Sequence, residues 1–238
     1  MAEVPRFLVD APLTGSGEAV LCPEESRHAA TVLRLRCGDG VVVFDGLGHY
    51  ALGRIGDAAR GCVRVSVDEV ITEPRNDIHI TIATAIPKGK RWQMLVEKCT
   101  ELGVDRLIPM LSKRSVVKGE GNAERWRRWA IEAAKQCRRA YIPEILEPVE
   151  LENVLAMAQR DNDLPLVADP EGEPPRTYLD AIKSSGRVMV LVGPEGGFSE
   201  EEAVSFKNAD VHGISLSLFI LRVETAAATA CALIRDLR

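Results

Sequence analysis

The sequence predicts an α/β fold class, with a parallel-sheet domain preceded by a small β-barrel domain. Three observations predict it. Residues 188–192 form a run that is apolar on both faces, as in a buried parallel strand. Strand-like and helix-like segments alternate from residue 78 onward. Short strands punctuated by glycine fill the first part of the chain. We therefore expect one domain over residues 1–72 and a second over residues 73–238.

The first domain is expected to be a barrel with one short helix. Val63, Val65 and Val67 alternate with polar residues, which is the period of a half-buried strand. Asp45-Gly46 is a turn signal between two strand-like segments. The expected elements are strands at residues 41–44, 50–55 and 63–67, and a helix at residues 24–35.

The second domain is expected to begin after the polar, proline-containing segment Glu73–Asp77. Apolar residues recur at helical spacing over residues 91–102, and Gly103 fits the position just beyond that helix. The expected elements are strands at 78–86, 104–110, 164–168 and 188–192, a strand-like run at 214–221, and helices at 91–102, 123–139, from 199 and at 226–235.

A glycine-rich turn at Gly193–Phe198 is the candidate binding site. It joins a buried strand to a helix that should begin at Ser199, because Ser199 and Glu202 have the spacing of a capping box. Glycine lets a ligand approach bare backbone closely. The alternative is an ordinary strand–loop–helix unit, and spacing alone does not decide between the two.

Composition and charge narrow the class of protein. The 238 residues carry a net charge of −5, yet residues 86–141 contain 14 Lys and Arg against 6 Asp and Glu. This basic segment is typical of a local phosphate-binding surface, although solvated helix faces give the same count. The scattered Cys and His residues predict neither disulfides nor a metal site. No signal peptide or membrane span is expected, so a cytoplasmic location is predicted.

The helix expected over residues 123–139 combines arginines with Trp126 and Trp129. Such a surface can stack on splayed bases while binding phosphates. Alternatively the tryptophans pack inward, and we favour that interpretation for at least one of them.

Two motifs carry a resemblance to a known family. GPEGGFSEEE at residues 193–202 is followed by ILRVETAA at residues 220–227. The pair resembles the RsmE family of bacterial ribosomal RNA uridine-N3 methyltransferases, in the SPOUT superfamily, over nearly the whole chain. The resemblance implies a PUA-like RNA-binding barrel, a SPOUT domain with a C-terminal trefoil knot, and S-adenosyl-L-methionine as cofactor. It also implies a homodimer whose substrate is 16S ribosomal RNA in the assembled small ribosomal subunit.

The resemblance, read with the residue chemistry, assigns candidate site residues. Bare backbone in the glycine-rich turn and an apolar slot for adenine are expected to hold the cofactor. The cofactor candidates are Ala168, Gly193, Pro194, Glu195, Gly196, Gly197, Leu216, Leu218, Ile220, Leu221, Arg222 and Thr225. The RNA-binding candidates are Arg6, His28, Arg34, Arg36, Lys88, Lys90, Arg91, Arg114, Gln136 and Arg139. The chain departs from the family pattern at Ser217 and Phe219, where glycine and arginine are usual.

Three residues are candidates for the chemistry. Uridine N3 must lose its proton around the time that it attacks the methyl group. Glu195 or Glu224 could accept that proton, and Arg139 could stabilise the charge on the uridine oxygens. Structural roles stay open, because Glu195 could hold its own turn and Glu224 could cap the last helix. Glu202 is interpreted as a capping-box partner alone.

Two other functions stay open. A non-catalytic RNA-binding factor in ribosome assembly would also need a β domain and a basic segment. A SPOUT methyltransferase with a different RNA target would keep the same cofactor site.

Overall fold

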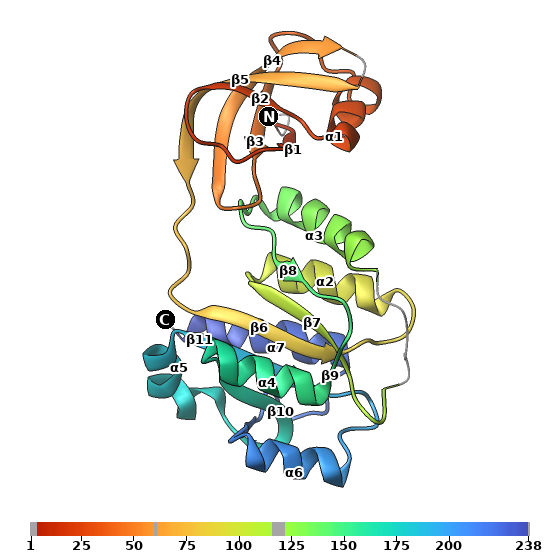
Figure 1. Ribbon diagram of the computed structural model, residues 1–238, viewed down its shortest axis with the longest axis vertical. Coiled ribbons are helices and arrows are strands. Elements are labelled where there is room, and N and C mark those ends of the chain that lie inside the picture. The colour runs from red at the N-terminus through yellow and green to blue at the C-terminus, as the bar shows by residue number, and fades with distance from the viewer. Residues whose placement is uncertain (1–3, 60, 116–121, 238) are drawn as a thin grey trace. The chain divides into compact units, whose positions relative to one another are not determined.

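The computed structural model describes residues 4–59, 61–115 and 122–237. The chain divides into two compact units (Figure 1). Unit 1 comprises residues 1–75 and 134–142, and unit 2 comprises residues 76–133 and 143–238. Each unit has its own sheet and its own apolar core.

Unit 1 is built on a five-stranded sheet of order β1-β3-β4-β5-β2. Val63, Val65 and Val67 are buried and their neighbours are exposed, which confirms the predicted alternation. The expected helix is present as α1 followed by a π-helical turn that ends at Val32. The elements are β1 (Arg6–Leu8), β2 (Gly17–Val20), α1 (Pro23–Arg27), η1 (His28–Val32), β3 (Gly40–Phe44), β4 (His49–Ala59) and β5 (Cys62–Thr72).

Unit 2 is built on a parallel sheet of order β12-β10-β11-β6-β7-β8, with β9 also paired to β7. The central strand β11 (Arg187–Val192) is buried from Val188 onward, which confirms the prediction from its apolar run. The other strands are β6 (His79–Ala85), β7 (Arg106–Leu111), β8 (Glu144–Ile145), β9 (Val149–Glu150), β10 (Leu164–Glu173) and β12 (His212–Ile214). The helices are α2 (Arg91–Glu101), α3 (Ala123–Cys137), α4 (Leu151–Asp161), α5 (Leu179–Ser185), α6 (Glu200–Asn208) and α7 (Val223–Asp236), with a 3₁₀ turn at Pro175–Tyr178 (η2).

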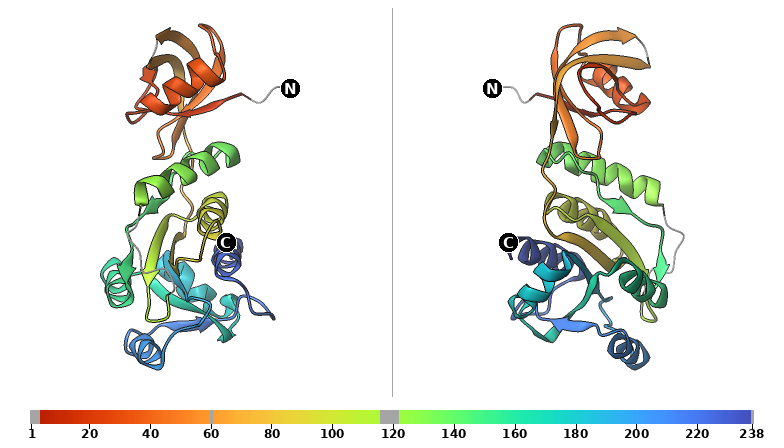
Figure 2. Two further views of the ribbon diagram at one scale, coloured as in Figure 1. Left: turned by 90° about the vertical axis from the view of Figure 1, so that its right-hand side faces the viewer. Right: turned by 60° about the vertical axis from the view of Figure 1, so that its left-hand side comes forward.

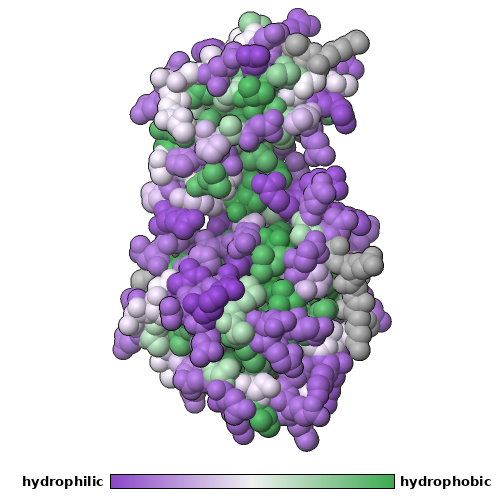
Figure 3. Space-filling view, viewed as in Figure 1, coloured by the Kyte–Doolittle hydropathy of each residue, from purple (hydrophilic) through white to green (hydrophobic). Residues whose placement is uncertain are grey.

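Helices cover both faces of the unit 2 sheet, with α4 and α6 on one face and α2 and α7 on the other (Figure 2). Met189 and Leu191 of β11 pack in one core cluster with α4 and Phe206 of α6. The alternate residues Val188 and Val190 point to the opposite face, because side chains alternate along a strand. Over α6, at the bottom of Figure 3, the surface is mostly hydrophilic. The doubly covered sheet explains why its strands are apolar on both sides.

The strand expected over residues 214–221 is wrong beyond Ile214. From Ser215 the chain is irregular, and the Phe219 N–H donates to Ser217 Oγ at 3.1 Å in a tight turn. Leu218, Phe219 and Ile220 therefore leave the sheet and are exposed. We call these three residues the apolar tip. Their hydropathy suggested burial, but the pairing that would bury them ends with β12.

A charged cluster lies where β7, β10 and β11 begin. Buried Arg106 donates to Asp161 at 2.7 Å and to Asp163 at 3.0 Å, and Arg187 donates to Asp163 at 2.8 Å. The side chain of Asp163 has no exposed surface, so its charge is balanced by these two arginines.

None of the helices in the described part of the chain is both long and apolar enough to cross a membrane.

The first prediction concerns Arg106. Arg106→Met should destabilise unit 2 by about 3–5 kcal/mol, because it leaves a buried carboxylate with one fewer partner. Urea unfolding followed by circular dichroism measures this change. Arg160→Met is the matched control: Arg160 donates to the other oxygen of Asp161 but is mostly exposed, so its loss should change the midpoint little. Equal midpoints for the two variants would contradict the assignment.

Acid stability gives a second prediction. Hydrogen bonds from Arg160 and Arg106 lower the pKa of Asp161 from 3.8 to about 2. A carboxyl whose pKa is lower in the folded chain stabilises it above the unfolded value, and that stabilisation is lost as the pH falls toward about 2. Unfolding midpoints of Asp161→Asn should therefore fall less steeply than those of the unchanged chain below about pH 4. Parallel pH profiles would exclude this role for Asp161.

Candidate functional site

A pocket lies at the edge of the unit 2 sheet where the parallel strands end, which we call the carboxyl edge. Residues 168–170 within β10 and the segments that follow β11 and β12 enclose a cavity of about 400 Å³. This volume lies within the range of about 300–1,000 Å³ typical of small-molecule sites. The lining residues are mostly apolar: Ala168, Asp169, Pro170, Val192, Gly193, Pro194, Glu195, Gly197, Phe198, Leu216, Ser217, Phe219, Ile220, Leu221, Arg222, Val223 and Ala226.

The glycine turn, residues 193–198, has no space for a side chain at its first position. A Cβ atom on Gly193 would lie 2.7 Å from the ring of Phe198, closer than real contacts allow. The Gly197 N–H donates to the Pro194 carbonyl at 2.8 Å and closes the turn. Gly197 has φ +68°, which favours glycine. The Phe198 ring therefore requires glycine at position 193 and the positive φ favours it at position 197, so the turn presents bare backbone to the cavity.

Glu202 fixes the turn from behind. Its carboxylate accepts from the Ser199 N–H at 2.7 Å, and Ser199 Oγ accepts from the Glu202 N–H, so the predicted capping box is confirmed. The other carboxylate oxygen accepts from the Lys113 N–H at 2.8 Å, which the sequence did not indicate. The same buried side chain thus caps α6 and ties it to the segment after β7.

Two further carboxylates lie beside the turn and share one arginine. Arg91 Nη1 is 3.0 Å from Glu195 Oε1 and 3.9 Å from Glu224 Oε2. Glu195 is about half exposed and lines the cavity, whereas Glu224, in the first turn of α7, is buried. Within residues 4–59, 61–115 and 122–237, Glu224 Oε2 is buried and has no hydrogen-bond partner. The N-cap residue of α7 is Arg222, and in the described structure its side chain makes no capping hydrogen bond. No hydrogen bond there supports the interpretation of Glu224 as a cap of this helix.

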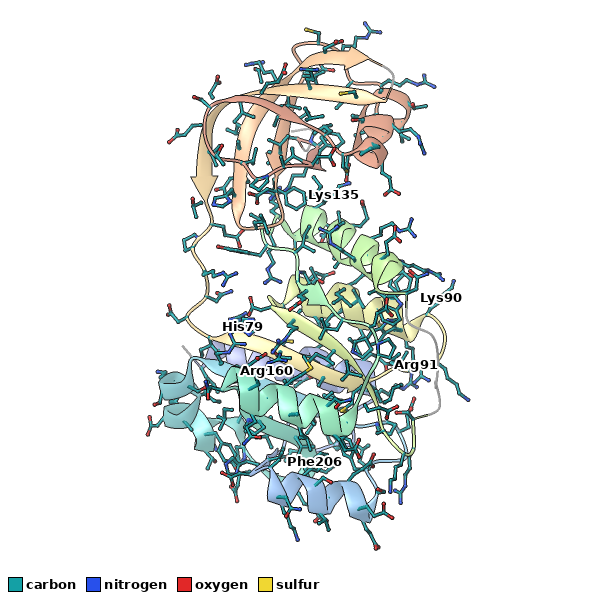
Figure 4. The ribbon with its side chains drawn as sticks, in the orientation of Figure 1. His79, Lys90, Arg91, Lys135, Arg160 and Phe206 are labelled. Atoms are coloured by element: carbon teal, nitrogen blue, oxygen red, sulfur yellow. The ribbon has the colours of Figure 1, made fainter. Side chains whose placement is uncertain are left out.

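Cations follow β6 and β7 at the same edge of the sheet. Lys88 and Lys90 are exposed in the segment after β6, and Arg91 follows as the first residue of α2 (Figure 4). Arg114, in the segment after β7, donates to the Gly196 carbonyl at 2.8 Å. The neighbouring strands β11, β6 and β7 thus bring the glycine turn and these cations to one edge.

Trp126 and Trp129 have different environments. Trp126 is buried and packs edge-on against Trp92, with 5.3 Å between the ring centroids. This confirms that at least one tryptophan packs inward. Trp129 is partly exposed and lies under the guanidinium of Arg125 at 5.1 Å. Only Trp129 keeps surface that a base could contact.

In unit 1 the RNA-binding candidates fall into exposed and buried groups. Arg34, Arg36 and Gln136 are exposed, and His28 is partly exposed. Arg6 is half-buried, with its guanidinium 5.1 Å from the Phe44 ring, and burial lowers its pKa. It donates to the backbone carbonyl of Arg139 at 3.4 Å.

Arg139 is 9% exposed, and the preceding residue, Arg138, has φ +64°. A left-handed backbone is unusual for arginine and sets the direction in which the chain leaves α3. Within unit 1 these contacts give Arg6 a structural role beside Arg139. Lys135, one turn earlier, pairs with Glu25 at 2.8 Å (Figure 4).

The cavity contains most of the residues that the sequence assigned to the cofactor. Nine of the twelve line it, and the other three are Gly196, Leu218 and Thr225. Leu218 is 98% exposed and contributes no surface to the cavity lining. Sequence reasoning missed Asp169, Pro170, Val192, Phe198, Ser217, Phe219, Val223 and Ala226. Most of these directly neighbour a predicted residue, so the position at strand ends was the available signal. In the described ranges no group of three or more His, Cys, Asp and Glu side chains is arranged to hold a metal ion.

Comparison with family models gives two matches. A model described as an RNA methyltransferase domain matches residues 74–235. A model described as an RNA methyltransferase PUA domain matches residues 21–67. Curated relatives include ribosomal RNA small subunit methyltransferase E of Rickettsia conorii, 31% identical over 97% of this chain and 94% of the relative. The protein of the same name from Mycobacterium tuberculosis is 32% identical over 94% of this chain and 88% of the relative.

Solved structures agree over the full length. A ribosomal RNA small subunit methyltransferase E from Neisseria gonorrhoeae, bound to S-adenosyl methionine, is 26% identical with a TM-score of 0.86, covering 99% of this chain and 98% of that one. A Legionella pneumophila protein in complex with the cofactor SAM is 28% identical, with the same TM-score and coverage. The arrangement of elements is therefore that of a SPOUT methyltransferase domain with a PUA-like domain.

The prediction from this geometry concerns the cap of α6. Glu202→Ala removes the acceptor of two backbone N–H groups, those of Ser199 and Lys113, and should destabilise unit 2 by about 2–3 kcal/mol. Ser199→Ala removes only the cap and should cost about 1 kcal/mol. Thermal unfolding by calorimetry measures both. If the two variants unfold at the same temperature, the contact of Glu202 with Lys113 contributes nothing.

Proposed function

The chain belongs to the ribosomal RNA small subunit methyltransferase E family, and from that premise we propose that it methylates N3 of a specific uridine in 16S ribosomal RNA, with S-adenosylmethionine as the methyl donor. One observation carries the proposal to this chain: the 400 Å³ cavity and the cations of the segments after β6 and β7 share the carboxyl edge of unit 2. Ligands of open α/β sheets bind at that edge.

The cavity suits the methyl donor in size and chemistry. Leu216 and Ile220 offer apolar surface for an adenine ring, and the glycine turn offers bare backbone. Backbone groups there are expected to read the polar edge of the ligand, as in other largely apolar sites. S-adenosylmethionine, when bound, supplies a methyl group on a positively charged sulfur, and the electron pair of the carbon–sulfur bond leaves with that sulfur. The two neighbours solved with this molecule support the assignment.

Glu195 is our choice for the group that takes the uridine proton. Its carboxylate lines the cavity and is about half exposed, so substrate can reach it. The N3–H bond breaks, its proton moves to a carboxylate oxygen, and the electron pair left on N3 forms the new bond to the methyl carbon. Glu224 is the alternative acceptor, since none of the described residues donates a hydrogen bond to its Oε2. General-base assistance of this kind contributes about 10²–10⁴-fold to a rate.

Two sets of cations are proposed to bind RNA. In unit 2 these are Lys88, Lys90, Arg91 and Arg114, and in unit 1 they are Arg34 and Arg36 with His28 and Gln136. Arg139 is proposed to stabilise the developing charge on the uridine oxygens. Arg6 then supports Arg139 through its backbone carbonyl. A domain boundary near residue 73 is proposed, supported by the separate matches at residues 21–67 and 74–235.

We also propose that the chain acts in the cytoplasm as a homodimer, on the assembled small ribosomal subunit, and that its C-terminal segment forms the trefoil knot expected from the family. The apolar tip supports the dimer: Leu218, Phe219 and Ile220 are 98, 79 and 88% exposed. Contiguous exposed apolar side chains are unfavourable in water and mark interaction surfaces. A second copy of the chain would cover them.

Calorimetry with S-adenosylmethionine tests the cofactor. Gly193→Ala should weaken binding about tenfold or more, because the new methyl group displaces Phe198 from the cavity wall. Gly196→Ala is the matched control, since its Cβ would lie at an ordinary 3.6 Å from Arg114 and outside the cavity lining. A chain without any affinity for S-adenosylmethionine would eliminate the proposed function and favour a non-catalytic RNA-binding factor.

Methylation of RNA tests the substrate. Assembled small subunits and naked 16S ribosomal RNA from cells that lack the enzyme are each incubated with the protein and labelled S-adenosylmethionine. We expect 3-methyluridine by mass spectrometry, with faster transfer to assembled subunits. Transfer of the methyl group to another base or to the ribose would refute the uridine assignment, while the assignment of the cofactor site would stand.

Sedimentation tests the dimer. Phe219→Asp should weaken self-association about tenfold or more, because a charge replaces apolar surface that the second copy would bury. Val204 is also exposed and apolar, but it lies on α6 and outside the apolar tip, so Val204→Asp should leave self-association unaltered. An unchanged dimer in Phe219→Asp would show that the apolar tip lies outside the interface.

A further inference from the structure

Two arginines reach the glycine turn from different segments of unit 2. Arg91, at the start of α2, donates to the carboxylate of Glu195 at 3.0 Å. Arg114, after β7, donates to the backbone carbonyl of Gly196 at 2.8 Å. Both arginines are candidates for binding RNA phosphates, yet each already has a partner on the turn that borders the cavity. Binding of RNA by either one therefore changes a contact of the turn.

The two contacts differ in kind. Arg114 donates to a neutral carbonyl, which phosphate does not resemble. Arg91 donates to a carboxylate through Nη1, and a phosphate oxygen offers a guanidinium the same kind of charge-assisted contact. The side chains of Arg91 and Glu195 are 31% and 46% exposed, so water screens their attraction. Exposed pairs of this type stabilise a folded protein only weakly. A phosphate could exchange with Glu195 at little cost.

Glu224 provides a reason for Arg91 to stay at the site during such an exchange. Its carboxylate is 8% exposed, and Oε2 is 3.9 Å from Arg91 Nη1 without a hydrogen bond. A buried carboxylate oxygen is destabilising until a donor reaches it. When Arg91 releases Glu195, a small rotation can bring its guanidinium within hydrogen-bond distance of Glu224. Arg91 would then remain beside the turn and face a phosphate.

We propose that Arg91 is a positioning residue that changes its partner when RNA binds. In the RNA-free protein it pairs with Glu195. When RNA binds, a phosphate replaces Glu195, and Glu224 keeps the guanidinium of Arg91 beside the turn. The carboxylate of Glu195 is thereby released to accept the N3 proton only when RNA is present. The exposed Lys88 and Lys90 lie just before Arg91 and would attract the same phosphate backbone (Figure 4). This inference rests on the proposed function for the identity of the substrate.

The test is a double-mutant cycle on RNA affinity, measured by fluorescence anisotropy with a labelled oligoribonucleotide from the methylated region and without S-adenosylmethionine. Glu195→Gln should bind RNA about two- to fivefold more tightly, because the carboxylate of Glu195 no longer competes with phosphate for Arg91. In an Arg91→Met background the same change should have no effect. In an Arg114→Met background the gain should persist, because Arg114 does not contact a carboxylate of the turn. Arg114→Met is thus the matched control.

Three results would overturn the proposal: Glu195→Gln leaves RNA affinity unchanged, weakens it, or gives the same gain in the Arg91→Met background. The last result would mean a general effect of removing one negative charge. Single-turnover methylation adds a second signature, since Glu195→Gln should bind RNA more tightly yet react about 10²-fold more slowly. Failure of the proposed function can be told apart from failure of the exchange, because in the first case the unchanged chain would methylate no RNA, whatever the RNA affinities of the variants. Matching thermal midpoints establish that each variant is folded.

Discussion

The absence of space at Gly193 is the constraint on which the site depends. The ring of Phe198 occupies the place where a Cβ atom would lie, so only glycine fits directly after β11 while that ring keeps its position. Phe198 in turn packs edge-on against Phe206 of α6, with 4.7 Å between the ring centroids. The position of α6 therefore fixes the turn, and the buried carboxylate of Glu202 fixes α6. The bare backbone at Gly193 is thus a consequence of how Phe198 packs between the turn and α6.

Local chemistry made much of this predictable from the sequence. The capping box at Ser199, the doubly apolar strand at residues 188–192 and the alternation of Val63, Val65 and Val67 each depend on residues close together in the chain. Spacing therefore suffices to predict them. The part of the cavity wall made by the glycine turn was also predictable, because ligand-facing residues follow directly after strands of a parallel sheet. Leu216, Ile220 and Leu221 were assigned with the help of the family resemblance, because the run that contains them had been expected to form a strand.

The features that spacing did not predict depend on contacts between residues far apart in the sequence. The run from Ile214 to Leu221 is apolar enough for a strand, but its pairing with β10 ends at Ile214. Hydropathy reports a preference for burial and says nothing about which neighbour is present. Arg6 shows the converse, because a charged residue near the start of the chain lies half-buried between Phe44 and Tyr50. The 89 positions that separate Lys113 from Glu202 likewise hide their contact from any local pattern.

The charged residues at the carboxyl edge also come together through long-range contacts. Arg91, Glu195 and Glu224 are far apart in the sequence, and each alone has an ordinary structural explanation. The strand order β11-β6 places the turn after one strand beside the helix start after the other, which brings these charges together. Once they are adjacent, one guanidinium has two carboxylates within 4 Å and satisfies only one of them by a hydrogen bond. An arginine with a second acceptor already in place can exchange its first partner without leaving a buried charge alone. That property belongs to the arrangement of all three residues, and no pair of them would have it.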